Sequence, residues 1–212
     1  MVDLNPPQDW EITEKEVNLS LIQDASSRIR EIVPPTPVAR SYFHSKQLGL
    51  NVWFKLENFN VTGSFKIRGA ANALTIAKKD DLKKGVIAAS AGNHAQGVAY
   101  VSRILGVKAK IYMPERTPLN KVAATRDQGA EVFLGGAVYD DAYTNALSEY
   151  NSKGGMLIHA FSDAEVINGQ GTAGLEILNQ IENVGAIIIP VGGGGLSGGI
   201  ACAIKSIRPD VL

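Results

Sequence analysis

The sequence has little of what several classes of protein require. It contains 1 cysteine, Cys202, which excludes an internal disulfide and indicates a reducing compartment such as the cytoplasm. Its 3 histidines, His44, His94 and His159, do not have the spacing of metal ligands. We therefore expect neither a disulfide framework nor a metal site.

Charge of one sign and long apolar runs are also missing. Lysine and arginine number 21 together, as do aspartate and glutamate, so that the formal net charge is +0. The basic excess that favours nucleic acid or an anionic membrane is absent. No apolar run approaches the roughly 20 residues that a membrane-spanning helix needs. The polar, proline-bearing residues 1–10 do not have the pattern of a signal peptide. We expect no nucleic-acid partner and no membrane partner.

What the sequence does contain is an alternation of apolar strands and helices. The expected strands lie at residues 86–90, 108–113, 131–134 and 186–191. Near the N-terminus, Thr13–Glu16 has the pattern of a capping box that opens a helix. The alternation is typical of parallel sheets covered by helices on both faces. We expect an α/β fold in which residues 1–84 and 155–212 belong to a large domain and residues 85–154 form a small inserted domain.

One lysine stands out in the stretch Thr62–Ala70. Lys66 follows a glycine-bearing turn and begins an expected helix, with Phe65 and Ile67 providing apolar bulk around it. Desolvation lowers the pKa of a lysine toward the neutral, nucleophilic amine, and neutral amines form Schiff bases with aldehydes. Lys66 is therefore the candidate for the chemistry. The alternative is a surface lysine at a helix start, with its ammonium group in water.

Four glycines, Gly192–Gly195, lie between the expected strand 186–191 and a helix. Glycine lets a backbone approach a ligand closely, and the start of a helix offers unpaired N–H groups and a positive dipole end. This pattern predicts a phosphate cradle. It is neither a Walker loop nor a clean dinucleotide fingerprint. A flexible turn is the alternative.

A second loop, Ser90–Gly97, also ends an expected strand and opens a helix. Asn93 either caps that helix or donates from its amide to a ring oxygen or carboxylate of a ligand. Ligands of open parallel sheets bind at the carboxyl ends of the strands, so the three motifs are expected to meet at one cleft. A Schiff-base lysine, a phosphate cradle and a polar ring contact together fit a phosphorylated aldehyde cofactor.

The three motifs, Thr62–Ala70, Ser90–Gly97 and Pro190–Gly199, resemble those of the fold-type II pyridoxal-phosphate enzymes, and among them the threonine/serine dehydratases. The resemblance extends from about Ile12 to the last residue. It implies two three-layer, parallel-sheet domains of the tryptophan synthase beta-like fold, with pyridoxal 5′-phosphate in the cleft between them. Members of this family continue through more strands, so we expect the large domain to be incomplete at Leu212.

The resemblance also implies a role for each motif. Lys66 would carry the cofactor as a Schiff base and form the catalytic centre together with Ser64. Phe65 would lie over one face of the cofactor ring, and Asn93 would donate to its phenolic oxygen. The phosphate would be held by Gly192, Gly193, Gly194, Gly195 and Leu196. The carboxylate of the substrate would be received by Ser64, Ser90, Ala91, Gly92, Asn93 and His94.

The implied reaction is the dehydration and deamination of L-threonine, and less efficiently of L-serine, to a 2-oxo acid and ammonia. The amine of Lys66 would remove the α-proton. A serine racemase-like enzyme is the first alternative, but related racemases carry a serine where this chain has Ala91, and alanine has no proton to give. A second alternative is an inert chain that serves as a binding partner, and a third is a nucleotide-binding module. The family implies an amino-acid substrate and a homodimer or homotetramer.

Overall fold

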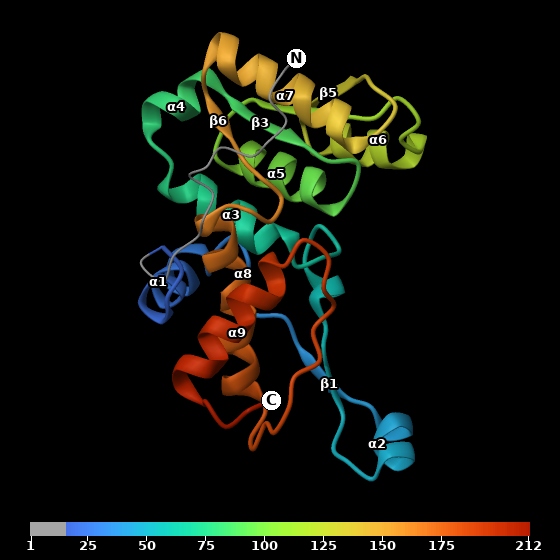
Figure 1. The fold of residues 1–212 in the computed structure, drawn as a ribbon, viewed down its shortest axis with the longest axis vertical. Coiled ribbons are helices and arrows are strands. Elements are labelled where there is room, and N and C mark those ends of the chain that lie inside the picture. The colour runs from blue at the N-terminus through green and yellow to red at the C-terminus, as the bar shows by residue number, and fades with distance from the viewer. Residues whose placement is uncertain (1–15) are drawn as a thin grey trace.

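A four-stranded parallel sheet forms one end of the molecule in the computed structural model, which describes residues 16–212 (Figure 1). Its strands are β3 (Val86–Ala89), β4 (Ala109–Met113), β5 (Glu131–Leu134) and β6 (Met156–Leu157). They lie in the order β5-β4-β3-β6, and every neighbouring pair is parallel. The carboxyl ends of all four strands therefore share one edge. The parallel α/β sheet expected from the sequence is confirmed.

Helices cover both faces of this sheet, as the alternation of side chains requires. The helices around the sheet are α4 (Lys79–Lys84), α5 (Asn93–Ile104), α6 (Leu119–Asp127) and α7 (Tyr139–Lys153). In β3, Val86 and Ala88 belong to the core cluster that contains the apolar residues of α5. Ile87 and Ala89 instead pack with Ala146 of α7 on the opposite face. A buried strand with two covered faces explains why β3 is apolar throughout.

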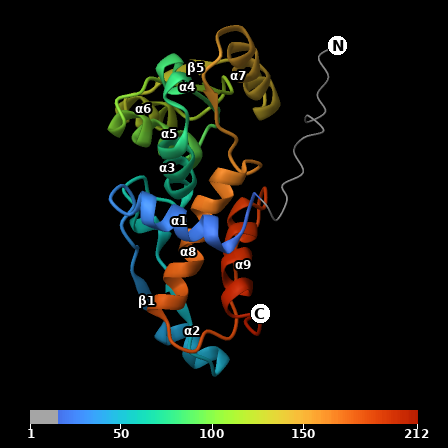
Figure 2. The ribbon, with the colours of Figure 1, turned by 90° about the vertical axis from the view of Figure 1, so that its left-hand side faces the viewer.

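The helix α3 (Lys66–Ile76) lies between this sheet region and a group of three helices (Figure 2). That group consists of α1 (Leu19–Ile29), α8 (Ala164–Gln180) and α9 (Gly195–Ile207). The backbone of α3 is approached closely from two sides. A Cβ atom on Gly97 of α5 would lie 3.2 Å from the nitrogen of Ile67, and one on Gly169 of α8 would lie 2.5 Å from the carbonyl oxygen of Arg68. Because Gly97 and Gly169 have no side chains, α5 and α8 pack directly against the backbone of α3.

The start of α1 shows which capping residue operates. Asn18 caps the helix, because its side-chain oxygen accepts a hydrogen bond of 3.0 Å from the nitrogen of Leu21. The expected capping box at Thr13–Glu16 begins outside the described residues, and the helix begins at Leu19.

The second parallel sheet expected from the sequence is not formed within residues 16–212. The expected strand at residues 186–191 is extended but pairs with no other strand there. Ile187 and Ile189 pack against the helical core of α8 and α9, whereas Ile188 is 99% exposed. The expectation of a buried strand was wrong for this side chain, because a strand is buried on both faces only where neighbouring elements cover both.

The strand β6 lies just beyond the domain boundary expected at residue 155, but it pairs with a strand from the other side of that boundary. The nitrogen of Met156 donates to the carbonyl of Gly85 (3.0 Å), and that of Ile158 donates to the carbonyl of Ile87 (3.0 Å). Residues 156–157 therefore belong to the sheet of the expected small domain, because their main-chain partners are in β3. The division into domains otherwise stays a prediction.

An arm projects from the helical end of the molecule (Figure 1). It contains the antiparallel pair β1 (Val38–Arg40) and β2 (Trp53–Lys55), with α2 (Tyr42–Leu48) between them, and the short 3-10 helix η1 (Glu57–Phe59) follows. The left-handed backbone of Gly49 (φ 67°) ends α2. Among the helices of residues 16–212, none is long and apolar enough to cross a membrane.

Candidate functional site

The amine of Lys66 is half-buried at the start of α3. Its Nζ donates a hydrogen bond of 2.8 Å to the carbonyl oxygen of Ala160 and lies 5.4 Å from the ring centroid of Phe65. Burial lowers the pKa of Lys66 below that of an ordinary lysine. Ser64 is buried, and its Oγ accepts a long hydrogen bond (3.4 Å) from the main-chain nitrogen of Lys66. The apolar surroundings expected from the sequence thus favour the neutral amine.

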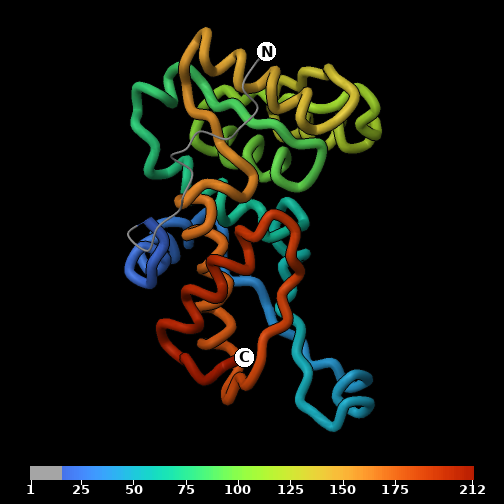
Figure 3. The backbone as a smooth tube through the Cα atoms, viewed as in Figure 1, coloured from blue at the N-terminus to red at the C-terminus, as the bar shows by residue number. Residues whose placement is uncertain are grey.

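A short segment, residues 158–161, connects the Lys66 amine to both expected loops. It leads from β6 to α8, that is, from the sheet to the helical group (Figure 3). The carbonyl of Ile158 lies 3.4 Å from Nε2 of His94, while that of Ala160 accepts from Lys66. The ring of Phe161 lies against Gly193, where an added Cβ would be 2.3 Å from its Cγ atom. Residues from all three motifs therefore contact this segment.

Sequence reasoning missed this segment. The available signal was the apolar run Met156–Ile158, which ends in His159 much as β3 ends in Ser90. Because β6 is parallel to β3, the residues that follow both strands emerge at the same sheet edge. A run of only three apolar residues was too short to indicate on its own that it joins this sheet.

The expected phosphate cradle, Gly192–Leu196, leads into the start of α9. Gly194 adopts a left-handed backbone (φ 86°) and caps α9, a conformation that disfavours side chains. Gly193 must remain without a side chain because of the ring of Phe161. The first N–H groups of α9, at Gly195 and Leu196, are left without helical partners at its positive end. Leu196 turns its side chain into the core of α8 and α9, so only its backbone is available to a ligand.

The loop at residues 90–94 tests the capping alternative for Asn93. Gly92 occupies the N-cap position and Asn93 is the first residue of α5, without a side-chain capping bond. Asn93 is exposed, and its amide has no hydrogen-bond partner within residues 16–212. The Oγ of Ser90 accepts from the nitrogen of Gly92 (3.2 Å) and so shapes the turn around Ala91. The capping alternative was wrong, and the amide of Asn93 can donate to a ligand.

Two imidazoles lie close enough to Lys66 to sense its charge. His94 is buried, and burial, with the positive charge of Lys66 next in importance, lowers its pKa to about 3. The same two causes lower the pKa of His159 to about 4. Nδ1 of His159 accepts from the main-chain nitrogen of Ser162 (3.0 Å), which places the ring proton on Nε2. Both rings are therefore neutral near pH 7.

The buried His94 predicts a loss of stability in acid. Its pKa is about 3 in the folded protein and about 6.5 when unfolded, so below pH 6.5 the unfolded state binds the extra proton. We expect the unfolding free energy to fall by about 1.4 kcal/mol per pH unit from this group until about pH 3. Urea unfolding at pH 7, 5.5 and 4.5 should show a steeper decline for the wild type than for His94→Gln. Parallel declines would contradict the neutral, buried state of His94.

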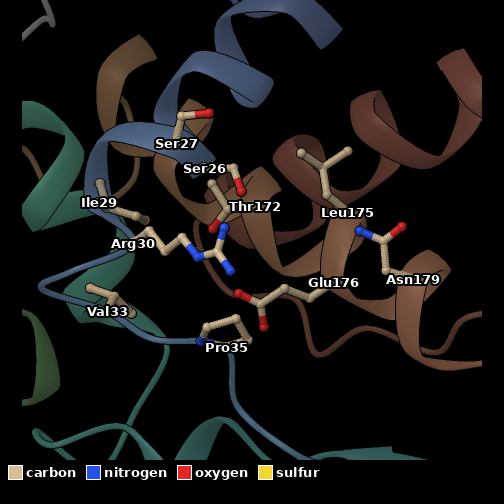
Figure 4. A pocket seen from close by; sticks show the side chains of 10 residues that line it. All are labelled: Ser26, Ser27, Ile29, Arg30, Val33, Pro35, Thr172, Leu175, Glu176 and Asn179. Carbon is tan, nitrogen blue, oxygen red and sulfur yellow. The ribbon is translucent and has the colours of Figure 1, made fainter.

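A groove of about 230 Å³ lies away from these loops, between α1 and α8 (Figure 4). Its lining includes Arg30, Thr172, Glu176 and Asn179 and contains none of the expected site residues. Among the residues that the structure describes, Arg30 has no side-chain hydrogen bond or ion pair, whereas Glu176 is bound to Arg68 from behind the groove. The expected site is therefore not at this groove but at the sheet edge beside α3.

Most of the chain also matches a known protein family. Residues 29–212 match the family described as pyridoxal-phosphate dependent enzyme. An L-threonine ammonia-lyase of Geobacter sulfurreducens is 49% identical over 192 residues, which are 91% of this chain and 48% of that protein. The chain thus spans about half the length of the curated relatives that it matches first.

Solved structures show the same relationship in three dimensions. The processed form of threonine deaminase isoform 2 from Solanum lycopersicum is 39% identical and superposes with a TM-score of 0.88, covering 94% of this chain and 55% of that one. Maize serine racemase is 34% identical with a TM-score of 0.90, covering 92% of this chain and 60% of that one. The family match, the identity and the shared fold agree with the resemblance that the three motifs carry. The chain therefore belongs to the family of pyridoxal-phosphate-dependent enzymes.

Proposed function

We propose that this chain performs the pyridoxal-phosphate-dependent dehydration of L-threonine, and less efficiently of L-serine, to a 2-oxo acid and ammonia. The observation that carries the proposal is the half-buried amine of Lys66, joined to the asparagine loop and the glycine loop by residues 158–161. The names of the relatives support the substrate, since L-threonine ammonia-lyases are 45–49% identical to this chain.

The residues present fit pyridoxal phosphate. Its phosphate needs a cradle of N–H groups without side chains, and an added Cβ on Gly192 or Gly194 would meet nothing within 4 Å. Asn93 has an amide without a partner in the described part of the chain, suited to the ring oxygen. Phe65 stands beside the amine of Lys66. Gly192–Leu196 would hold the phosphate, Asn93 and Phe65 the ring, and Lys66 the aldehyde.

When bound, the cofactor supplies an aldehyde that combines with amines and a ring that withdraws electrons from the α-carbon of an amino acid. The side chains supply the remaining functions. The amine of Lys66, whose pKa burial lowers toward the neutral form, takes the proton from the α-carbon. Ser64 and the loop of residues 90–94 hold the carboxylate of the substrate through hydroxyl and N–H groups. His94, neutral and buried, adds no positive charge that would compete with this proton transfer.

A racemase is the second candidate, because serine racemases are among the structures that superpose on this chain. Racemisation needs a proton donor on the face of the α-carbon opposite to Lys66. The loop at residues 90–94 carries Ala91 in the place where related racemases carry a serine, and a methyl group donates no proton. We therefore expect L-serine to yield pyruvate without D-serine, which chiral chromatography of the products distinguishes.

We propose further that the enzyme is a cytoplasmic homodimer or homotetramer acting on a free amino acid. The sequence contains a single cysteine, Cys202, so it cannot form an internal disulfide, as is usual in a reducing compartment. Large apolar side chains are exposed on the arm around α2: Tyr42 (75%), Phe43 (67%), Leu48 (63%) and Leu50 (66%). Apolar groups gathered in this way support an association surface.

The function is tested by absorption spectroscopy of the chain with added pyridoxal phosphate, before and after L-threonine. We expect a visible band that changes with L-threonine and is followed by formation of 2-oxobutyrate. Lys66→Ala removes the amine while leaving the backbone helical, so both the band and the product should be lost. A band that depends on Lys66 without product would favour an inert binding chain. A band that survives in Lys66→Ala would refute the role of this lysine.

A further inference from the structure

A buried charge cluster lies behind the expected site and has no part in the chemistry described above. It consists of Lys55, Glu57, Arg68 and Glu176, two cations and two carboxylates. The guanidinium of Arg68 is 0% exposed, and its pKa stays high because the two carboxylates offset the effect of burial. The cluster is neutral as a whole, as a buried group of charges needs to be.

Arg68 binds both carboxylates through two atoms each. Its Nε and Nη2 donate to Glu57, both at 2.7 Å, while Nη1 and Nη2 donate to Glu176 at 2.6 and 2.9 Å. Nη1 also reaches Oγ1 of Thr172 at 3.0 Å. A planar guanidinium held at both edges has one orientation relative to its partners. Arg68 therefore fixes α3 against η1 on one side and against α8 on the other.

The position of this anchor relative to Lys66 suggests its use. Residues two apart on a helix project about 200° apart, so Lys66 and Arg68 leave the first turn of α3 in nearly opposite directions. Arg68 reaches Glu176 in α8, and Lys66 reaches Ala160 in the segment just before α8. The first turn of α3 is thus bound, through Lys66 on one side and Arg68 on the other, to one continuous stretch of chain, residues 160–176.

The contact between α3 and α8 makes this arrangement sensitive to rotation. An added Cβ on Gly169 would lie 2.7 Å from Cα of Gly69, so the two backbones touch at this point. With the contact acting as a pivot, a change of the angle between the helices moves the amine of Lys66 relative to the carbonyl of Ala160. The bonds from Arg68 to Glu176 and Thr172 lie beside this pivot and oppose the rotation.

We propose that Arg68 and Glu176 are positioning residues, which hold the amine of Lys66 at the carbonyl of Ala160 by fixing the angle between α3 and α8. Neither residue touches the reacting atoms. The inference rests on the proposed role of Lys66, and it concerns where the amine is held rather than which substrate it meets. A role in stability alone would leave the amine unchanged wherever the protein stays folded.

The test measures the reactivity of Lys66 in cofactor-free protein by labelling with acetic anhydride across pH 6–11 and peptide mass spectrometry. Glu176→Gln keeps the shape of the side chain and removes its charge, and Arg68→Lys keeps the charge and removes the planar fork. In both variants we expect Lys66 to move into water, so that its pKa rises toward that of an ordinary lysine. Labelling at pH 8 should then fall roughly threefold or more.

Arg30→Gln is the matched control, because Arg30 lines the same groove as Glu176 (Figure 4) but makes no bond to the charge cluster among the described residues. It should leave the labelling of Lys66 at the wild-type value. Circular dichroism establishes that each variant is folded at the labelling temperature. If Glu176→Gln does not fold, Thr172→Val removes one bond to Arg68, together with the bond from the Thr172 hydroxyl to the carbonyl of Gly169, and should shift the labelling in the same direction.

Unchanged labelling of Lys66 in folded Glu176→Gln, Arg68→Lys and Thr172→Val would overturn the proposal. The charge cluster would then serve stability only. Because no cofactor or substrate is present, this result is independent of the spectroscopic test of the function. A chain that fails to form 2-oxobutyrate can still show the positioning effect, and an active chain can fail to show it.

Discussion

Replacing Arg68 by methionine is expected to lower the free energy of unfolding by about 3–5 kcal/mol, as measured by urea denaturation at pH 7. Methionine fills much of the same volume but leaves Glu57 and Glu176 without the guanidinium that binds both of them. Their side chains are only 16% and 12% exposed, so water cannot replace the lost hydrogen bonds fully. The loss comes from the uncompensated carboxylates rather than from a cavity.

The pH dependence separates these two causes. Burial alone would raise the pKa of Glu57, but hydrogen bonds and charge from Arg68 outweigh burial and hold this pKa below its usual value. The stabilisation of Glu57 is therefore present above about pH 4.5 and is lost as the pH falls through the lower folded-state pKa. The difference between wild type and Arg68→Met should shrink below pH 4.5. A difference that stays constant in acid would mean that packing, not charge, is the cause.

Replacing Gly169 by alanine is expected to destabilise the protein by about 2–3 kcal/mol, although alanine is the better helix former. The new Cβ would lie 2.5 Å from the carbonyl oxygen of Arg68 and 2.7 Å from Cα of Gly69. These are backbone atoms of α3, which no change of a side-chain rotamer can move. The helices α3 and α8 must separate, so the labelling of Lys66 should change together with the stability.

Gly198→Ala is the matched control for this effect. Gly198 also lies inside a helix, α9, but an added Cβ would meet nothing within 4 Å. The substitution should therefore stabilise the protein by about 0.5–1 kcal/mol through helix propensity alone. Thermal unfolding of the two variants should give shifts of opposite sign. If both variants shifted the unfolding temperature upward, the contact between α3 and α8 would have space for an additional methyl group.

The sequence predicted several elements around the candidate site because their signals are local. The helix that begins at Lys66 and the strand Glu131–Leu134 lie where periodicity placed them. The helix that follows Gly192–Gly195 also begins as expected. Glycine and apolar patterns report turns and strand ends directly, so residue types alone indicate which positions face a sheet edge.

Pairing was less predictable, because it depends on residues far apart in the chain. The extended segment at residues 186–191 reads as a buried strand, yet within the described residues it has no strand partner and Ile188 is exposed. The run Met156–Ile158 indicates the start of a further unit in the sequence, but only the structure shows that Met156–Leu157 joins the sheet beside β3. An apolar run indicates that a segment can form a buried strand, but it does not indicate which strand it pairs with.

By itself, the sequence determined the α/β class and singled out Lys66 and two loops as the candidate site, since each follows from residue types within a few positions. Only the tertiary structure decided what holds them together. Residues 158–161 follow β6 and meet His94 after the parallel β3 at one sheet edge, while the packing of α3 and α9 brings Lys66 and Gly193 to the same segment. Arg68 becomes an anchor because folding brings Glu57 and Glu176 to its two sides. Arg68 and Glu176 are 108 residues apart in the chain, so their pairing follows from the packing of α3 against α8 and not from any local pattern.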